Sequence, residues 1–145
     1  MYTFPPPDII DLIRKMFNGT LRSVLLCQNC GCKRTQTESF SSISLPLAKE
    51  FPTTTDTEVR SSRRGKISVE VCLNNFTRPE ELGDLTNCPS CSFKTKTLKQ
   101  HTFSKLPEIL CLHLKRFDSA KNKKITDFVS FPAHNLDMGK HLPHW

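Results

Sequence analysis

The stretch LPEILCLHLKRF, residues 106–117, contains the most apolar run of the chain. From Ile109 to Phe117, apolar residues occupy both sets of alternate positions, which is typical of a strand that is buried on both faces. His113 lies inside this run, where a histidine is more often packed in the core than used as a catalyst. The stretch therefore predicts a central β-strand with His113 in the core.

Shorter strands are expected on both sides of this run. Alternating apolar and polar residues, bounded by turn residues, predict strands over residues 20–27, 33–47, 93–103 and 125–131. The last of these is expected to stop at Pro132, which has no N–H to donate to a sheet.

Two helices are expected among the strands. The first begins at Asp8 as its N-cap and ends before Gly19, which we expect in the left-handed conformation of a helix C-terminus. The second begins after Ser68 as its N-cap. One face of this second helix is apolar and consists of Val69, Cys72, Leu73 and Phe76.

A further helical turn is predicted after the second helix. Thr77 and Glu80 have the spacing of a capping box, and Gly83 is placed to end the turn. Together these elements predict an α+β fold in which strands predominate.

Residues 53–66 read TTTDTEVRSSRRGK, a polar segment nearly free of large apolar side chains. Such a composition buries too little apolar surface to stay ordered, so we expect a mobile loop. Its basic residues suit a polyanion or a nuclear-import receptor, or they form a solvated tip. They are Arg60, Arg63, Arg64 and Lys66.

The composition limits the classes of protein to consider. The chain has 145 residues, 37% of them hydrophobic, and a formal net charge of +7. This is one domain's length with a thin core, and its charge permits a polyanionic or acidic partner. We expect no membrane span, because no run approaches the ~18–20 apolar residues that a span needs. We also expect no secretory signal, because the N-terminal residues MYTFPPPDIIDL include no basic segment, no apolar segment and no small-residue cleavage site. We therefore expect a nuclear or cytoplasmic protein, with the nucleus favoured, whose thiols are reduced.

Four of the seven cysteines form two CxxC pairs, Cys27/Cys30 and Cys88/Cys91. Two intervening residues let one tight turn present both thiolates to a tetrahedral Zn²⁺. The pairs are separated by 57 residues, so the predicted zinc site would clamp two distant hairpins together. Redox dithiols or coincidental cysteines are the alternatives.

The remaining cysteines have other expected roles. Cys32 is an alternative ligand to Cys30, and the sequence leaves this choice open. Cys72 and Cys111 occupy apolar positions and are expected to be small buried hydrophobic residues.

LPEILCLHLKRF, followed by ITDFVSFP at residues 125–132, resembles the central box of the ubiquitin-specific protease family. Residues 17–23 and CLNNFTRPEELGD at residues 72–84 match the same family, and the two CxxC pairs match its zinc site. The resemblance covers residues 9–137. CLNNFTRPEELG and FPAHNLDM resemble most the branch that deubiquitinates histones, including the SAGA co-activator's deubiquitinase.

The resemblance implies a domain shaped like a right hand, in which zinc-bearing fingers, here residues 25–40 and 87–103, grip ubiquitin. It implies that Phe117 lines the channel for the ubiquitin tail, with core packing as the alternative, and that Arg116 pairs with a ubiquitin acid or faces solvent. The implied partners are ubiquitin, ubiquitinated proteins such as histones, and co-activator subunits.

The family's catalytic motifs are not found in this chain. Its nucleophile follows a Gly-Asn-Thr/Ser run, which precedes none of these cysteines, and its catalytic histidine precedes a tyrosine, whereas the one tyrosine here is Tyr2. We therefore expect residues 1–145 to be a partial catalytic domain, a fragment or a truncated product, that is inactive alone. The parent protein is expected to be a thiol protease that cleaves isopeptide bonds at the C-terminus of ubiquitin.

Two other functions stay open at this point. A zinc-stapled module that binds nucleic acid would use the basic charge, but aromatic residues make up only 8% and do not alternate with basic ones, so no direct nucleic-acid readout is expected. An inactive pseudo-enzyme that binds ubiquitin is the other alternative.

Overall fold

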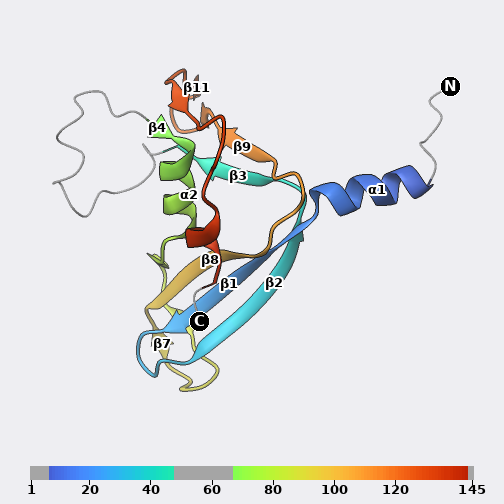
Figure 1. The fold of residues 1–145 in the computed structure, drawn as a ribbon. Coiled ribbons are helices and arrows are strands. Elements are labelled where there is room, and N and C mark those ends of the chain that lie inside the picture. Colours follow the sequence, from blue (N-terminus) through green and yellow to red (C-terminus); the bar gives the residue numbers. More distant parts are fainter. Residues whose placement is uncertain (1–6, 48–66, 144–145) are drawn as a thin grey trace.

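The computed structural model describes residues 7–47 and 67–143 as an antiparallel sheet with smaller strand pairs and two α-helices around it (Figure 1). The sheet has the strand order β2-β1-β8-β5. Its strands are β1 (Gly19–Cys27), β2 (Lys33–Phe40), β5 (Glu80–Glu81) and β8 (Thr97–Lys105). In Figure 1, β1, β2 and β8 run side by side toward the end of the molecule where β7 lies.

Eight shorter strands form four pairs. Two pairs are parallel: β3 with β9, and β4 with β12. Two are antiparallel: β6 with β7, and β10 with β11. Their bounds are β3 (Ile43–Pro46), β4 (Ile67–Ser68), β6 (Thr86–Asn87), β7 (Lys94–Thr95), β9 (Leu112–Lys115), β10 (Phe117–Asp118), β11 (Lys123–Lys124) and β12 (Val129–Ser130).

The helices are α1 (Pro7–Phe17), α2 (Val69–Thr77) and the 3₁₀ turn η2 (Gly139–His141). Ser68 caps α2 as predicted, because its Oγ accepts a hydrogen bond of 3.2 Å from the Val71 N–H. α1 projects away from the sheet (Figure 1), and its apolar side chains Ile9, Leu12 and Ile13 are exposed. Within the described residues, neither α-helix has the length and apolarity needed to span a membrane.

The core lies between helix α2, strand β3 and the four-stranded sheet. It joins Leu21 of β1 and Phe103 of β8 to Leu45 of β3 and to Cys72 and Leu73 of α2, all buried. The Phe40 and Phe103 rings meet edge to face, 5.7 Å apart. The α+β class with predominating strands is therefore confirmed, as is the apolar face predicted for α2.

The predicted central strand is shorter and more exposed than the sequence indicates. Only Leu112–Lys115 form β9, and Leu112 and Leu114 pack against the core. The opposite face is open: Cys111 and His113 are exposed, so the predictions of a core histidine and a buried Cys111 are wrong. The core packs against one face of β9 alone, and on the open face His113 Nδ1 lies 3.3 Å from Ser44 Oγ of the paired strand β3.

Gly19 does not end α1 in a left-handed conformation, so this prediction is wrong as well. Gly19 is the first residue of β1, and Gly31 is the one described glycine with a positive φ. A Cβ at Gly19 would lie 2.7 Å from the Lys105 carbonyl oxygen and would collide with the Phe40 ring. Glycine is required here because β2 and β8 approach the backbone closely.

The predicted capping box at Thr77 is also wrong. Thr77 is the last residue of α2 and its hydroxyl donates to the Leu73 carbonyl, while Glu80 belongs to strand β5. Arg78 precedes Pro79 and is extended (φ −71°, ψ 150°), because a following proline disfavours the helical conformation.

Three strand predictions differ in extent. Residues 93–103 divide into β7, which pairs with β6, and β8, which pairs with β1 and β5. Residues 33–47 form two strands, because β2 pairs with β1 whereas β3 turns away to pair with β9. Of residues 125–131, only β12 is a strand. The loop predicted at residues 53–66 lies outside the described residues.

Candidate metal centre

The four cysteines of the CxxC pairs meet at the far end of the sheet. Cys27 ends β1, and Cys88 follows β6, so two hairpin turns face each other. The four sulfur atoms all lie within 4.8 Å of one another. Across the gap, Cys27 Sγ lies 4.0 Å from Cys91 Sγ, and Cys30 Sγ lies 3.7 Å from Cys88 Sγ. The predicted convergence of these distant pairs is thus present.

The two CxxC turns have the same backbone hydrogen bonds. In the first, the Cys27 N–H donates to the Cys32 carbonyl at 3.0 Å and the Gly31 N–H donates to the Cys27 carbonyl at 3.0 Å. In the second, the Cys88 N–H donates to the carbonyl of Phe93 at 3.0 Å and the Ser92 N–H to the Cys88 carbonyl at 2.8 Å. Each turn therefore aims its two thiols at one point without help from the other.

The spacing of the sulfurs fits a tetrahedral zinc ion. A Zn–S bond of about 2.3 Å places the sulfurs of a regular tetrahedron roughly 3.8 Å apart. The two sulfur–sulfur distances across the gap, 3.7 and 4.0 Å, lie on either side of this value. A set of four thiols is also the donor set that zinc prefers in structural sites.

The protonation of the thiols supports the same fit. The Thr95 hydroxyl hydrogen-bonds to Cys27 Sγ at 3.2 Å and, with backbone N–H groups, lowers the pKa of Cys27 to about 6. Although a backbone hydrogen bond from Cys32 favours the Cys30 thiolate, desolvation and the three neighbouring sulfurs raise the pKa of Cys30 to about 12. The negative charge of one thiolate therefore disfavours the ionisation of the next thiol. Four thiolates this close need a cation to balance their charge.

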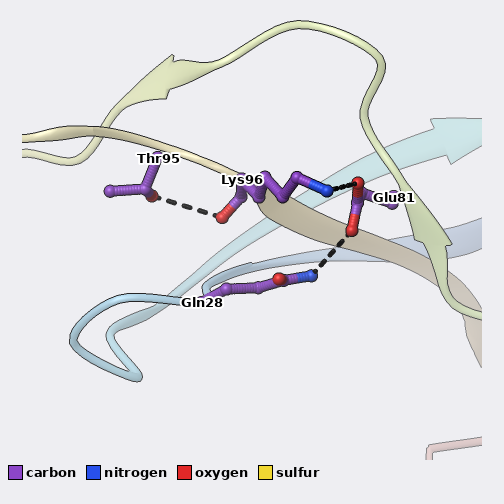
Figure 2. Close-up of polar contacts among 4 residues, drawn as sticks. All are labelled: Gln28, Glu81, Thr95 and Lys96. Carbon is purple, nitrogen blue, oxygen red and sulfur yellow. Dashed lines mark hydrogen bonds and ion pairs between the residues drawn. The ribbon is translucent and has the colours of Figure 1, made fainter.

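Polar side chains hold the two turns together around the sulfurs. Asn29 Nδ2 donates to Cys91 Sγ at 3.6 Å. Glu81 accepts a hydrogen bond of 3.3 Å from Gln28 Nε2, and its carboxylate lies 2.8 Å from Lys96 Nζ. Both contacts are drawn in Figure 2. The hydrogen bond from Lys96 lowers the pKa of Glu81, as the first of several causes. These contacts join the first turn, β5 and β7–β8.

Sequence reasoning missed these supporting residues. Asn29 and Thr95 are polar residues within four positions of a cysteine, which is a weak signal on its own. The sequence predicts Glu81 inside a helical turn, whereas its actual place beside Gln28 and Lys96 depends on strand β5 pairing with β8.

The other cysteines lie outside the cluster. Cys32 is half-buried and does not belong to the converging group, so the structure favours Cys30 over Cys32. Cys72 is fully buried in the core as predicted, and desolvation raises its pKa.

Arg116 and Phe117 directly follow β9 and lie outside the two CxxC turns. Phe117 begins β10, and its side chain is 58% exposed within the described residues. Arg116 is half-buried, and its Nη1 donates to the Asp127 carbonyl at 2.8 Å.

Comparison with known proteins agrees with this architecture. A family model described as ubiquitin carboxyl-terminal hydrolase matches residues 8–144. Ubiquitin carboxyl-terminal hydrolase 21 of Homo sapiens is 37% identical over 135 residues, covering 90% of this chain and 21% of the relative. Ubiquitin carboxyl-terminal hydrolase 22 of Mus musculus is 39% identical over 140 residues, covering 88% of this chain and 26% of the relative. The chain thus spans about a quarter of the length of these curated relatives.

Solved structures of a SAGA complex are similar in fold. The SAGA DUB module with Ubp8, bound to monoubiquitin, matches with a TM-score of 0.73 and 27% identity, over 92% of this chain and 27% of that chain. The Ubp8/Sgf11/Sus1/Sgf73 module bound to ubiquitin aldehyde matches with a TM-score of 0.69 and 27% identity, over 91% of this chain and 26% of that chain. The resemblance predicted from the sequence, including its SAGA-type character, is confirmed, and the chain belongs to the ubiquitin carboxyl-terminal hydrolase family.

Proposed function

We propose that this chain is the fingers and part of the palm of a deubiquitinating thiol protease, which hydrolyses isopeptide bonds at the C-terminus of ubiquitin. In this proposal, residues 1–145 bind zinc and grip ubiquitin, and the parent protein supplies the nucleophile and its histidine base. The observation that carries the proposal is the convergence of four cysteine sulfurs within 4.8 Å in a chain of this family.

The proposed metal ligands are Cys27, Cys30, Cys88 and Cys91. Zinc held by four thiolates has no open position for a substrate, so its role would be structural. It would tie the β1–β2 turn to the β6–β7 turn, which side-chain hydrogen bonds join in the described residues, with one exposed ion pair, Glu81–Lys96, beside them. Because an exposed ion pair contributes about 0–1 kcal/mol, the metal would supply most of the stability at this end of the sheet.

The proposed ubiquitin surface has two parts. The fingers, residues 25–40 and 87–103, would hold the globular part of ubiquitin, and β2 offers them a strand whose side chains are exposed nearly throughout. Phe117 would line the path of the ubiquitin tail, and Arg116 would lie beside it. Support for this comes from the exposure of Phe117, a large apolar side chain that is more than half exposed. Exposed apolar side chains that form a patch are typical of binding sites. Phe128 and Phe131, which follow in the chain, are exposed as well.

The proposed partners are ubiquitinated proteins, histones among them, and subunits of a co-activator complex, and the proposed location is the nucleus. The support is the structural likeness to Ubp8, which was solved with Sgf11, Sus1 and Sgf73 and with ubiquitin aldehyde. The net charge of +7 is compatible with acidic partners.

The test is a binding measurement on the 145-residue chain loaded with zinc. Monoubiquitin should bind, and Cys88→Ser, which removes one ligand, should abolish that binding, whereas Cys32→Ser should retain it. For comparison, the binding of the same chain to duplex DNA is measured over a range of salt concentrations. Binding to DNA with a steep salt dependence, and none to ubiquitin, would favour the nucleic-acid module instead.

A further inference from the structure

Two polar side chains reach sulfur atoms across the gap between the CxxC turns. Asn29, in the first turn, donates from Nδ2 to Cys91 Sγ of the second turn at 3.6 Å. Thr95, on β7 just after the second turn, places Oγ1 3.2 Å from Cys27 Sγ of the first turn. Each turn is therefore tied to a sulfur of the other, over 62 and 68 positions of sequence respectively.

The Thr95 hydroxyl has two acceptors and one proton. Its Oγ1 lies 3.2 Å from the carbonyl oxygen of Lys96, as Figure 2 shows, and equally close to Cys27 Sγ. When Cys27 is a thiol, its S–H can donate to Thr95 while Thr95 donates to Lys96. When Cys27 is a thiolate that binds a metal, the sulfur has no proton, and only Thr95 can donate in this pair.

We infer that Asn29 and Thr95 are positioning residues of the metal centre, which donate hydrogen bonds to the thiolates of Cys91 and Cys27 when these sulfurs bind metal. The inference rests on the proposed zinc-clamped fingers. Donors of this kind spread the negative charge of a thiolate and fix the direction of its lone pairs, which strengthens metal binding. Because the two donors cross between the turns, they also align the turns before the metal binds.

Substitutions that remove only the hydrogen-bond donor test the role of each residue separately. Asn29→Asp keeps the size of the side chain but replaces an N–H donor with a carboxylate, which repels the Cys91 thiolate. Thr95→Val keeps the shape and removes the hydroxyl, whereas Thr95→Ser keeps the hydroxyl. Gln36→Glu makes the same amide-to-carboxylate change on the exposed strand β2, outside the CxxC turns, and is the matched control for Asn29→Asp. Thr35→Val, on the exposed strand β2, is the control for Thr95.

The experiment is a titration of the full 145-residue chain with cobalt(II), read from the thiolate-to-cobalt charge-transfer absorption, followed by competition with zinc and a chelator. We expect Thr95→Val and Asn29→Asp each to weaken zinc binding roughly tenfold or more and to shift the charge-transfer band. Thr95→Ser and both controls should bind as the wild type does.

The outcomes distinguish this inference from the proposal on which it rests. Wild-type affinity in both Thr95→Val and Asn29→Asp would overturn the inference and leave the zinc site standing. An equal loss in Thr95→Ser and Thr95→Val would overturn the role of the hydroxyl. If the wild-type chain bound neither cobalt nor zinc, the metal centre itself would be overturned.

Discussion

Gly31 and Ser92 occupy equivalent positions in the two CxxC turns, with φ angles of 71° and 60°. Each follows the second cysteine of its pair, and each donates its N–H to the carbonyl oxygen of the first. The left-handed conformation is therefore a requirement of both turns. Glycine adopts it freely, whereas a residue with a Cβ does so at a cost of about 1–2 kcal/mol. The second turn thus contains strain that the first turn lacks.

The first prediction follows from this difference. Ser92→Gly should raise the free energy of unfolding of the zinc-loaded chain by about 1 kcal/mol, and Gly31→Ala should lower it by about as much. Apart from its two chain neighbours, no described residue has an atom within 4 Å of a Cβ at Gly31, so the loss of stability in Gly31→Ala would come from the backbone conformation alone. Urea denaturation at a fixed excess of zinc measures both changes.

Ser90→Gly is the matched control, because Ser90 lies in the same turn and is not among the described residues with a positive φ. This substitution should destabilise the chain slightly by adding freedom to the unfolded state. A Ser92→Gly variant as unstable as Ser90→Gly would contradict the strain argument.

The second prediction concerns the metal. Cys88→Ser should release one zinc per chain and unfold the two turns, because structural zinc sites contribute roughly 10–16 kcal/mol in small peptides. Cys72→Ser should leave the metal in place, since Cys72 lies in the core and outside the cluster. Elemental analysis of the purified proteins gives the zinc content. A full equivalent of zinc in the double variant Cys27→Ser/Cys88→Ser would contradict the ligand assignment.

The metal centre was predictable from sequence because its determinants are local. Each half of the site is specified by two residues between its cysteines. In the first pair Gly31 follows them, and in the second pair the two residues are Pro89 and Ser90. Ser68, which caps α2 through its own side chain, is a local signal of the same kind. In these places the neighbours in sequence are also the neighbours in space.

The errors arose where distant residues decide the outcome. The Asn18-Gly19 pair is typical of a helix end, but Gly19 is needed because Phe40 and Lys105 approach it from other strands. The alternation around His113 indicates an apolar strand but not which of its faces is covered. The contact of Asn29 with Cys91 joins residues 62 positions apart, so no local pattern contains it.

The third prediction concerns pH. His141 is fully buried; its Nδ1 lies 2.8 Å from Thr77 Oγ1, and its Nε2 has no partner among the described residues. Desolvation, followed by the charge of Lys140, lowers its pKa in the folded chain. Below about pH 6.5 the unfolded chain therefore binds a proton that the folded chain does not, and stability should fall as pH decreases.

His141→Gln keeps a hydrogen-bonding amide near Thr77 but does not titrate. Its stability should fall less steeply than that of the wild type between pH 7 and pH 5.5, by at most about 1.4 kcal/mol per pH unit. Thermal denaturation in a pH series, with zinc in excess, gives the slopes. Equal slopes in wild type and His141→Gln would show that this histidine does not contribute.

The fourth prediction is that the chain alone does not react with a ubiquitin vinyl-sulfone probe. A nucleophilic cysteine needs a base within hydrogen-bond reach, and in the described residues His113 contacts Ser44, His141 contacts Thr77, and no histidine hydrogen-bonds to a cysteine. Mass spectrometry after incubation should show unmodified protein. A stoichiometric adduct on one cysteine would reveal a nucleophile in this chain; Cys111, which precedes β9, is the exposed candidate outside the cluster.

The fifth prediction concerns Phe117 in the complete catalytic domain. Because 58% of the side chain is exposed, Phe117→Ala should leave the melting temperature nearly unchanged. If Phe117 lines the path of the ubiquitin tail, kcat/KM on ubiquitin conjugates should fall about tenfold, the effect of losing roughly 1.4 kcal/mol of contact in the transition state.

Alanine substitutions at two other phenylalanines are the references for Phe117→Ala. Phe103→Ala, at a fully buried position, should cost about 3–5 kcal/mol of stability. Phe128→Ala, at a side chain that is 78% exposed, tests whether any exposed phenylalanine of this region has the same effect. Thermal melts and steady-state cleavage of a ubiquitin conjugate separate the three substitutions, because a core residue changes the first measurement and a tail contact changes the second. Wild-type kinetics in a stable Phe117→Ala enzyme would exclude Phe117 from the ubiquitin site. A decrease in melting temperature as large as that of Phe103→Ala would mean that the rest of the domain buries Phe117.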